Sequence, residues 1–205
     1  MNPITLEYLK FSVAKGFDIL APTFSTLRQA VAREGGVKEQ YFGMTDDGKD
    51  ELVWVLNWPG STVPPEFEDA SNELRAKINA LDVNSKPESW FVPFRFAEEV
   101  RPALTAPVCE FAFLVLNDIN DKPKLAHSLH KTFTDCYFAD GFTGGNWGSA
   151  INNGRVCLYI LGWKSREHHA TFARSDLFAL EIDRLTPHCG PGSGGWFTKL
   201  TKEEY

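Results

Sequence analysis

The stretch VCLYILGWKSREHHATFARSDLF, residues 156–178, contains the clearest strand-turn-helix pattern in the chain. Its first eight residues, Val156 to Trp163, form a continuous apolar run, which is typical of a strand buried on both faces. Ser165 then occupies a position suited to a helix N-cap, ahead of a segment with helical spacing. The sequence predicts a strand over 156–163 and a helix that opens at Ser165 and carries His168 and His169.

The same pattern occurs once before in the chain, which indicates an internal duplication. A shift of 105 residues places VWVLNW, ending at Trp58, on LYILGW, ending at Trp163. The turns TDDGKD (45–50) and INNGRV (151–156) occupy equivalent places. Further matches at this shift are 4–13 with 109–118, Leu20 with Leu125, Phe24 with Leu129, Val31 with Cys136, Gly43 with Gly148 and Phe67 with Phe172, and one inserted residue brings Trp90-Phe91 onto Trp196-Phe197.

Each half is predicted to have the order β-α-β-β-α-β of a ferredoxin-like unit. The first unit covers residues 1–98 and the second covers 106–205. The segment AEEVRPALTAP, residues 97–107, is charged and carries two prolines, as joints between domains often do. In the first unit, the predicted elements are strands 4–13, 37–44, 51–58 and 89–96 and helices 17–34 and 66–82. Pro93 indicates that strand 89–96 lies at a sheet edge or contains a bulge.

The two units are expected to pack against each other through their sheets. A four-stranded sheet with both helices on one face leaves its other face bare, yet these strands are apolar on both faces. The predicted fold is therefore α+β, with two tandem ferredoxin-like units packed sheet to sheet as an intramolecular α+β barrel. We expect an interior space between the sheets.

Composition limits the kinds of partner. The chain has 21 basic and 27 acidic residues and a net charge of −6, so nucleic acid and anionic membranes are not expected partners. No apolar segment approaches the length of a membrane span, and the first residues read as a strand, not as a signal peptide. The four cysteines lack CxxC spacing and are read as small buried side chains of a reduced protein. The expected location is cytoplasmic.

The run GWKSREHH (162–169), followed by Phe172 and by SDLF (175–178), resembles the dimeric α+β barrel superfamily. Within it, the chain is most similar to antibiotic-biosynthesis monooxygenase-like and stress-responsive barrel proteins. The resemblance implies a small-molecule enzyme that acts without a bound cofactor on an aromatic or polyketide-like substrate. The implied reaction is a cofactor-independent oxygenation, or a cyclisation or isomerisation. Members usually pair two chains, which allows a homodimer here, although a duplicated chain can form the barrel alone.

His169 is the predicted catalytic base. Two adjacent helical residues point about 100° apart, so at most one of His168 and His169 faces inward, and the resemblance favours His169. The first half has Pro64 where His169 would stand, so only one half can carry a histidine-dependent site. The alternative is a histidine on the helix surface. The predicted substrate-binding residues are Trp58, Trp147, Tyr159, Trp163, Phe172 and His168, with core packing as the competing role of the tryptophans.

The remaining motifs give weaker indications of a functional site. His127 and His130 have a spacing that can support a metal, but no third ligand is evident, so no metal is predicted. His188 belongs to the glycine-rich segment TPHCGPGSGG, read as a connection or lid before the last strand. No nucleophile elbow, P-loop or dinucleotide fingerprint occurs. A non-catalytic ligand-binding or stress-response barrel remains the alternative function, and a haem-handling protein is a third.

Overall fold

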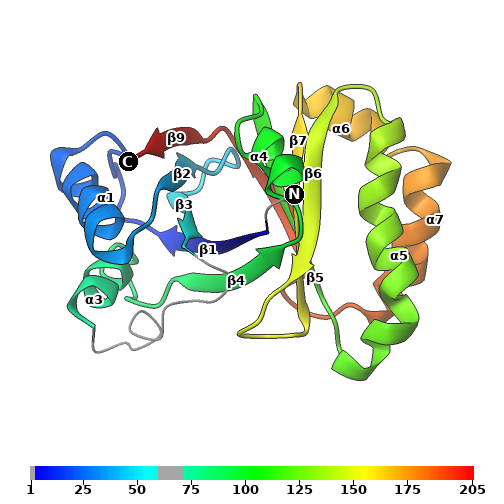
Figure 1. Cartoon of the computed structure of the whole chain (residues 1–205). Coiled ribbons are helices and arrows are strands. Elements are labelled where there is room, and N and C mark those ends of the chain that lie inside the picture. Colours follow the sequence, from blue (N-terminus) through cyan, green and yellow to red (C-terminus); the bar gives the residue numbers. More distant parts are fainter. Residues whose placement is uncertain (1–2, 60–71) are drawn as a thin grey trace.

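The computed structural model describes residues 3–59 and 72–205, which form two ferredoxin-like units side by side (Figure 1). Each unit has a four-stranded antiparallel core sheet with helices on its outer face. The first unit contains β1 (Ile4–Ser12), α1 (Pro22–Gly35), β2 (Glu39–Met44), β3 (Glu51–Trp58), α3 (Glu73–Asn79) and β4 (Glu88–Phe94). The second contains β5 (Val108–Val115), α5 (Lys122–Thr134), β6 (Phe142–Ser149), β7 (Val156–Trp163), α6 (Arg166–Phe172), α7 (Asp176–Leu185) and β8 (Gly194–Thr198).

The strand orders confirm the predicted fold class. The first sheet has the order β4-β1-β3-β2-β9, in which β9 is Thr201–Glu204, and the second has β6-β7-β5-β8. Without β9, the two orders are equivalent, as expected for a duplicated unit. β4, which contains Pro93, is an edge strand, as the proline predicts.

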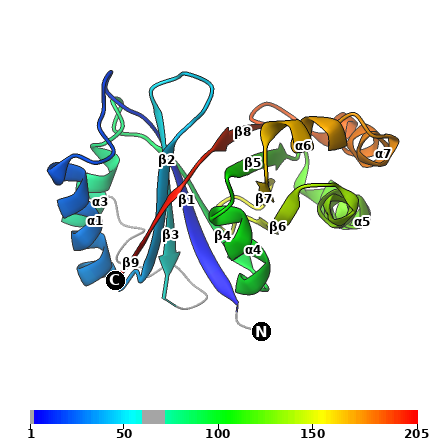
Figure 2. The same cartoon turned by 90° about the horizontal axis from the view of Figure 1, so that it is seen from above.

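Viewed from above, the molecule has four layers: helices α1 and α3, the first sheet, the second sheet, and helices α5 and α7 (Figure 2). The bare faces of the two sheets meet, as predicted. Their edges are joined by hydrogen bonds from Ile151 N to Phe91 O (2.9 Å) and from Asp46 N to Phe197 O (2.9 Å). The two sheets therefore close into an α+β barrel.

The prediction of an interior space is wrong over most of the barrel, because side chains from both sheets fill the region between them. Tyr8 from β1 packs against Phe111 and Phe113 from β5, with ring centroids 5.0 and 5.2 Å apart. These residues are almost completely buried. Large inward-facing residues on both sheets leave little room for a ligand at the centre.

The segment predicted as a joint folds as helix α4 (Ala97–Leu104). Val100, Ala103 and Leu104 are fully buried in the core between the sheets. Gly162 of β7 permits this packing, because a Cβ there would lie 2.7 Å from Ala103 Cα. The joint between the units is thus also part of the barrel core.

The end of the chain adds a strand that the sequence did not predict. β9 (Thr201–Glu204) falls in the segment assigned to the second unit, yet it pairs with β2 of the first sheet. Arg28 of α1 holds it through Glu203, with Nε 2.8 Å from Oε2. None of the helices within the described residues is long and apolar enough to cross a membrane.

Two further expectations need correction. The pairing of Thr5 with Trp58 matches that of Val108 with Trp163, so the first strands correspond at a shift of 103 residues, not 105. Leu20, expected in the core, is 73% exposed and precedes α1. The equivalences drawn for Pro64 and Phe67 lie outside the described residues.

Candidate functional site

The candidate site is a small cavity between the second sheet and its helices, on the opposite face of the sheet from the barrel core. Its volume is about 70 Å³. Strands β5 and β7 form its floor, and α5, α6 and α7 form its walls. The lining residues are Glu110, Ala112, Leu114, Thr132, Cys136, Tyr159, Leu161, Trp163, His169, Phe172, Phe178 and Ile182.

Three polar groups meet in this cavity. His169 Nε2 lies 3.3 Å from Glu110 Oε1, and Trp163 Nε1 donates a hydrogen bond of 2.8 Å to Glu110 Oε2. The Trp163 and His169 rings are edge to face, with centroids 5.3 Å apart. One carboxylate therefore holds an indole and faces an imidazole, in surroundings that are otherwise mostly apolar.

The N-terminus of α6 and the neighbouring rings determine the orientation of the His169 side chain. Ser165 caps α6, and its Oγ accepts a hydrogen bond from His168 N (3.4 Å). The helix then directs His169 toward the sheet, where its ring also packs against Phe197 at a centroid distance of 4.8 Å. A side chain between two aromatic rings and a carboxylate has few rotamers available to it.

Two other ionisable side chains, Cys136 and Tyr159, line the cavity. Burial raises the pKa of the Cys136 thiol and that of the Tyr159 phenol above their ordinary values. The Tyr159 hydroxyl donates to Leu129 O at 2.7 Å, so it is occupied by the backbone of α5. Glu110 and His169 are left as the pair suited to accept and stabilise a proton.

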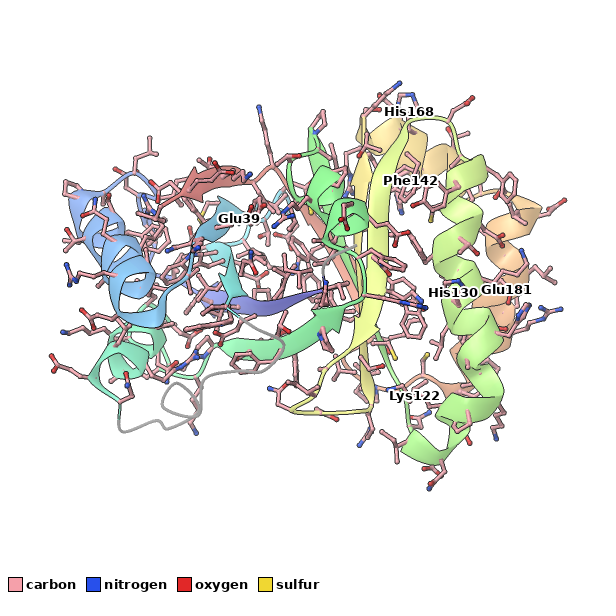
Figure 3. All side chains as sticks on the ribbon, in the orientation of Figure 1. Glu39, Lys122, His130, Phe142, His168 and Glu181 are labelled. Atoms are coloured by element: carbon pink, nitrogen blue, oxygen red, sulfur yellow. The ribbon has the colours of Figure 1, made fainter. Side chains whose placement is uncertain are left out.

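An open groove of about 490 Å³ adjoins the cavity through Phe172, which lines both. His168 lies in this groove, and its Nδ1 is 2.9 Å from Ser165 Oγ. Figure 3 shows His168 and Phe142 toward the same end of the second unit, with His130 further along α5. The two neighbouring histidines thus face different spaces, the cavity for His169 and the groove for His168.

The predicted aromatic residues do not form one pocket. Trp163, Tyr159 and Phe172 line the cavity. Trp147 stacks on the Tyr159 ring at 5.7 Å and donates to His130 Nδ1 (3.2 Å), so it lies beside the cavity wall and does not line the cavity. Trp58 lies in the first unit, remote from His169, where it donates to Glu7 Oε2 (2.9 Å).

The first unit contains a related but closed arrangement. Glu7 and Trp58 occupy the places of Glu110 and Trp163. Arg75 donates to both oxygens of Glu7, at 2.7 and 3.1 Å, and Ser89 Oγ donates at 2.7 Å. These bonds saturate the Glu7 carboxylate, whereas Glu110 faces a titratable imidazole beside a cavity.

Glu110 is the functional candidate that the sequence analysis missed. It stands in CEFAFLVLND, whose pattern predicts an apolar strand and nothing more. A carboxylate inside such a strand is a signal, because buried charges need a partner. The correct shift of 103 residues, which places Glu7 on Glu110, would have made this signal clear.

No metal cluster accompanies the pair. Among the described residues, no group of three His, Cys, Asp or Glu side chains is placed to hold a metal ion. His127 is exposed on α5, and His130 is bonded to Trp147. Within the part of the chain that the structure describes, Glu110 is therefore paired with an imidazole and an indole and not with further metal-ligating side chains.

Several solved structures share this fold. A protein provisionally named a monooxygenase, from Fusobacterium nucleatum subsp. nucleatum, superposes with a TM-score of 0.66 at 11% identity, covering 98% of this chain and 94% of its own. An anthrone oxidase-like protein gives a TM-score of 0.67 at 6% identity, with 98% and 93% covered. A major regulator of staphylococcal pathogenesis gives 0.55 at 13% identity, with 94% and 98% covered.

No family model matches the sequence, and no curated protein matches it. The structural likeness therefore defines the fold alone. The chain has the tandem α+β barrel fold found in monooxygenase-like proteins, which confirms the resemblance seen in GWKSREHH at the level of the fold.

Proposed function

We propose that the protein is a small-molecule enzyme that removes a proton from an aromatic or polyketide-like substrate, with His169 as the base. The observation that carries the proposal is the Glu110–His169 pair, 3.3 Å apart at the edge of an apolar cavity. A carboxylate beside the imidazole stabilises the imidazolium that forms when His169 takes a proton. The names of the neighbours support a monooxygenase-type reaction.

The chemistry follows from the surroundings of His169. A phenol or anthrone gives a proton to His169 Nδ1, because Nε2 faces Glu110 and carries the hydrogen that points at that carboxylate. The electron pair left behind is delocalised over the rings. Trp163 and Phe172 offer ring contacts to such an anion. In the oxygenation branch, dioxygen is the oxidant: a methylene carbon loses two hydrogens and gains one oxygen atom, and the second oxygen atom leaves as water. In the cyclase or isomerase branch, the anion rearranges and no oxygen is consumed.

Substrate size requires the groove as well as the cavity. A space of about 70 Å³ is too small for a polycyclic molecule, whereas the adjoining groove measures about 490 Å³. The reacting end of the substrate would reach His169 while the remainder lies along the groove near His168. Phe172 separates the two spaces, so its side chain must turn for substrate to enter.

The test begins with a melting-temperature screen against aromatic polyketides and 1,8-dihydroxyanthrone, since a ligand that binds only the native state raises its stability. Oxygen uptake and quinone absorbance are then followed for the stabilising compounds. His169→Ala should lower turnover about 100-fold or more. Glu110→Gln should cause a smaller loss, and His127→Ala, an exposed histidine on α5, should cause none. Full turnover in His169→Ala, or no stabilisation by any compound of the class, would overturn the proposal.

A non-catalytic binding function is the second candidate. The filled barrel interior and the small cavity favour it, and the same fold occurs in a protein named a regulator. Under this alternative, an aromatic ligand raises the melting temperature in a way that depends on His169, but no product forms and no oxygen is consumed. The same assays therefore separate the two functions.

A further inference from the structure

The two ends of the barrel interior differ. Helix α4 fills one end with Val100, Ala103 and Leu104. The other end opens into a cleft of about 460 Å³ between the facing sheets. This cleft shares no lining residue with the His169 cavity. It is lined by Lys10, Glu88, Trp90, Phe113, Val115, Asn153, Val156, Pro191, Gly192, Ser193 and Trp196.

Aromatic rings from both sheets line the cleft. Trp196 of β8 stacks on Phe113 of β5, with centroids 4.8 Å apart and planes inclined by 19°. The indole of Trp196 is anchored, because its Nε1 donates to the buried Tyr8 hydroxyl at 2.6 Å. Trp90 of β4, the duplicated counterpart of Trp196, contributes from the first sheet and is partly exposed. A flat molecule can therefore contact aromatic faces from both sheets.

A charged pair stands beside these rings. Lys10 Nζ lies 3.3 Å from Glu88 Oε1 and 4.1 Å from the Trp196 ring centroid. The Glu88 side chain is 47% exposed, so solvent reaches it from the cleft. The corresponding positions of the second unit are Phe113 and Gly194, so the duplication does not explain the pair. An ammonium and a carboxylate side by side offer a donor and an acceptor to one ligand group.

We propose that this barrel-end cleft binds a neutral, planar, hydroxylated aromatic molecule. Its ring lies between Trp90 and the Phe113–Trp196 stack, and its hydroxyl accepts a hydrogen bond from Lys10 and donates one to Glu88. A neutral hydroxyl suits the pair better than an anionic group, because Lys10 already faces two carboxylates, Glu88 at 3.3 Å and Glu51 at 3.8 Å. The site is independent of His169 and of the reaction proposed there.

The test uses 2-naphthol and the intact chain with ¹⁵N-labelled tryptophan. The six indole N–H signals act as local reporters, because Trp163 and Trp147 mark the His169 cavity while Trp90 and Trp196 mark the cleft. Titration should shift the Trp90 and Trp196 signals in a saturable manner and leave those of Trp163 and Trp147 in place. 2-Methoxynaphthalene, which cannot donate to Glu88, should bind about fivefold more weakly.

Two variants and a control complete the experiment. Glu88→Gln should weaken 2-naphthol binding about fivefold, and Trp90→Leu, followed through Trp196, should weaken it about tenfold. Glu73→Gln, a carboxylate exposed on α3, should leave binding unchanged. Dispersed spectra verify that each variant is folded. If Trp90→Leu is not folded, the affinity of Glu88→Gln alone tests the proposal. The proposal is overturned if only Trp163 or Trp147 responds, if no indole responds, or if a folded cleft variant binds like the parent chain.

Discussion

At the scale of single residues, the equivalent glutamates Glu7 and Glu110 have different charged partners. Glu7 is completely buried, and its charge is balanced by the two bonds from Arg75 and by Trp58 and Ser89. Glu110 keeps the bond to its tryptophan but meets His169 instead of an arginine. An arginine is permanently charged, whereas a histidine can exchange a proton near neutral pH. The Glu7 carboxylate is therefore fixed in a permanent ion pair, whereas the Glu110 carboxylate faces a side chain that can change its charge.

Glu7→Gln should be strongly destabilising. The substitution removes the Glu7 carboxylate from its ion pair with the buried Arg75 guanidinium, and loss of one partner of such a pair costs about 3–5 kcal/mol. Urea unfolding at pH 7 measures the change. The exposed pair of Glu73 and Lys77 is the control, since Glu73→Gln should leave the free energy of unfolding nearly unchanged. Equal effects of the two substitutions would show that the Glu7 pair is not structural.

At the scale of elements, α4 and β9 connect the two units, a role that the sequence does not predict for either segment. α4 packs between the sheets, and β9 carries the end of the chain from the second unit back to the first sheet. Each makes its contacts across the boundary between the units. The stability of the barrel should therefore depend on both.

Gly162→Ala should displace α4. Its added Cβ would lie 2.3 Å from Thr143 Oγ1 and 2.7 Å from Ala103 Cα, and a backbone atom cannot move aside cheaply. Overpacking of this kind costs about 1–3 kcal/mol. The matched substitution Gly154→Ala meets only the mobile end of the Ile119 side chain, at 2.7 Å, and should cost less in the same urea measurement. If Gly162→Ala leaves the free energy of unfolding unchanged, α4 is not tightly packed against β7.

The attachment of β9 should weaken in acid. Hydrogen bonding from Arg28 lowers the pKa of Glu203 below its ordinary value. Because the folded-state pKa is depressed, the stabilisation is fully present above the unfolded pKa of about 4.3 and disappears as the pH falls through the folded value. The difference in urea stability between the parent chain and Glu203→Gln should thus be largest near pH 7 and should vanish in acid. A difference that does not change with pH would refute this role of Glu203.

At the scale of the whole molecule, the repeat in the sequence was enough to predict two ferredoxin-like units packed by their sheets. VWVLNW and LYILGW carry that information because their side chains are apolar on both faces. The sequence does not predict α4, since the two prolines and the charges of segment 97–107 resemble a joint, and only the packing of Val100 and Leu104 shows the role of the helix. The position of the cavity was also missed. Apolar strands show that both faces are buried, but not which face retains a space.

The sequence was equally limited at the site. It indicated His169, Trp163, Tyr159 and Phe172, all of which line the cavity. It also grouped Trp58 with them, because equivalent positions in a duplicated chain look alike although they lie in different units. Glu110 could not be recognised as a partner of His169, since the residues are 59 positions apart and meet only when α6 packs on β5.

The two units should not fold separately. A chain ending at residue 98 would expose the inner face of its sheet, including Leu6, Tyr8 and Val55, and would lack β9. Expressed alone, residues 1–98 should unfold or self-associate, and addition of residues 99–205 should restore a 1:1 complex. Size-exclusion chromatography with light scattering measures both outcomes. A folded, monomeric fragment of residues 1–98 would contradict the sheet-to-sheet dependence.

A co-crystal structure with 1,8-dihydroxyanthrone tests the central claim most directly, which is that the working site lies between the second sheet and its helices. We expect the ligand to span the groove and the cavity, with Phe172 turned aside and the reactive carbon next to the His169 imidazole. Ligand density in the first unit, or only in the barrel-end cleft, would contradict the account.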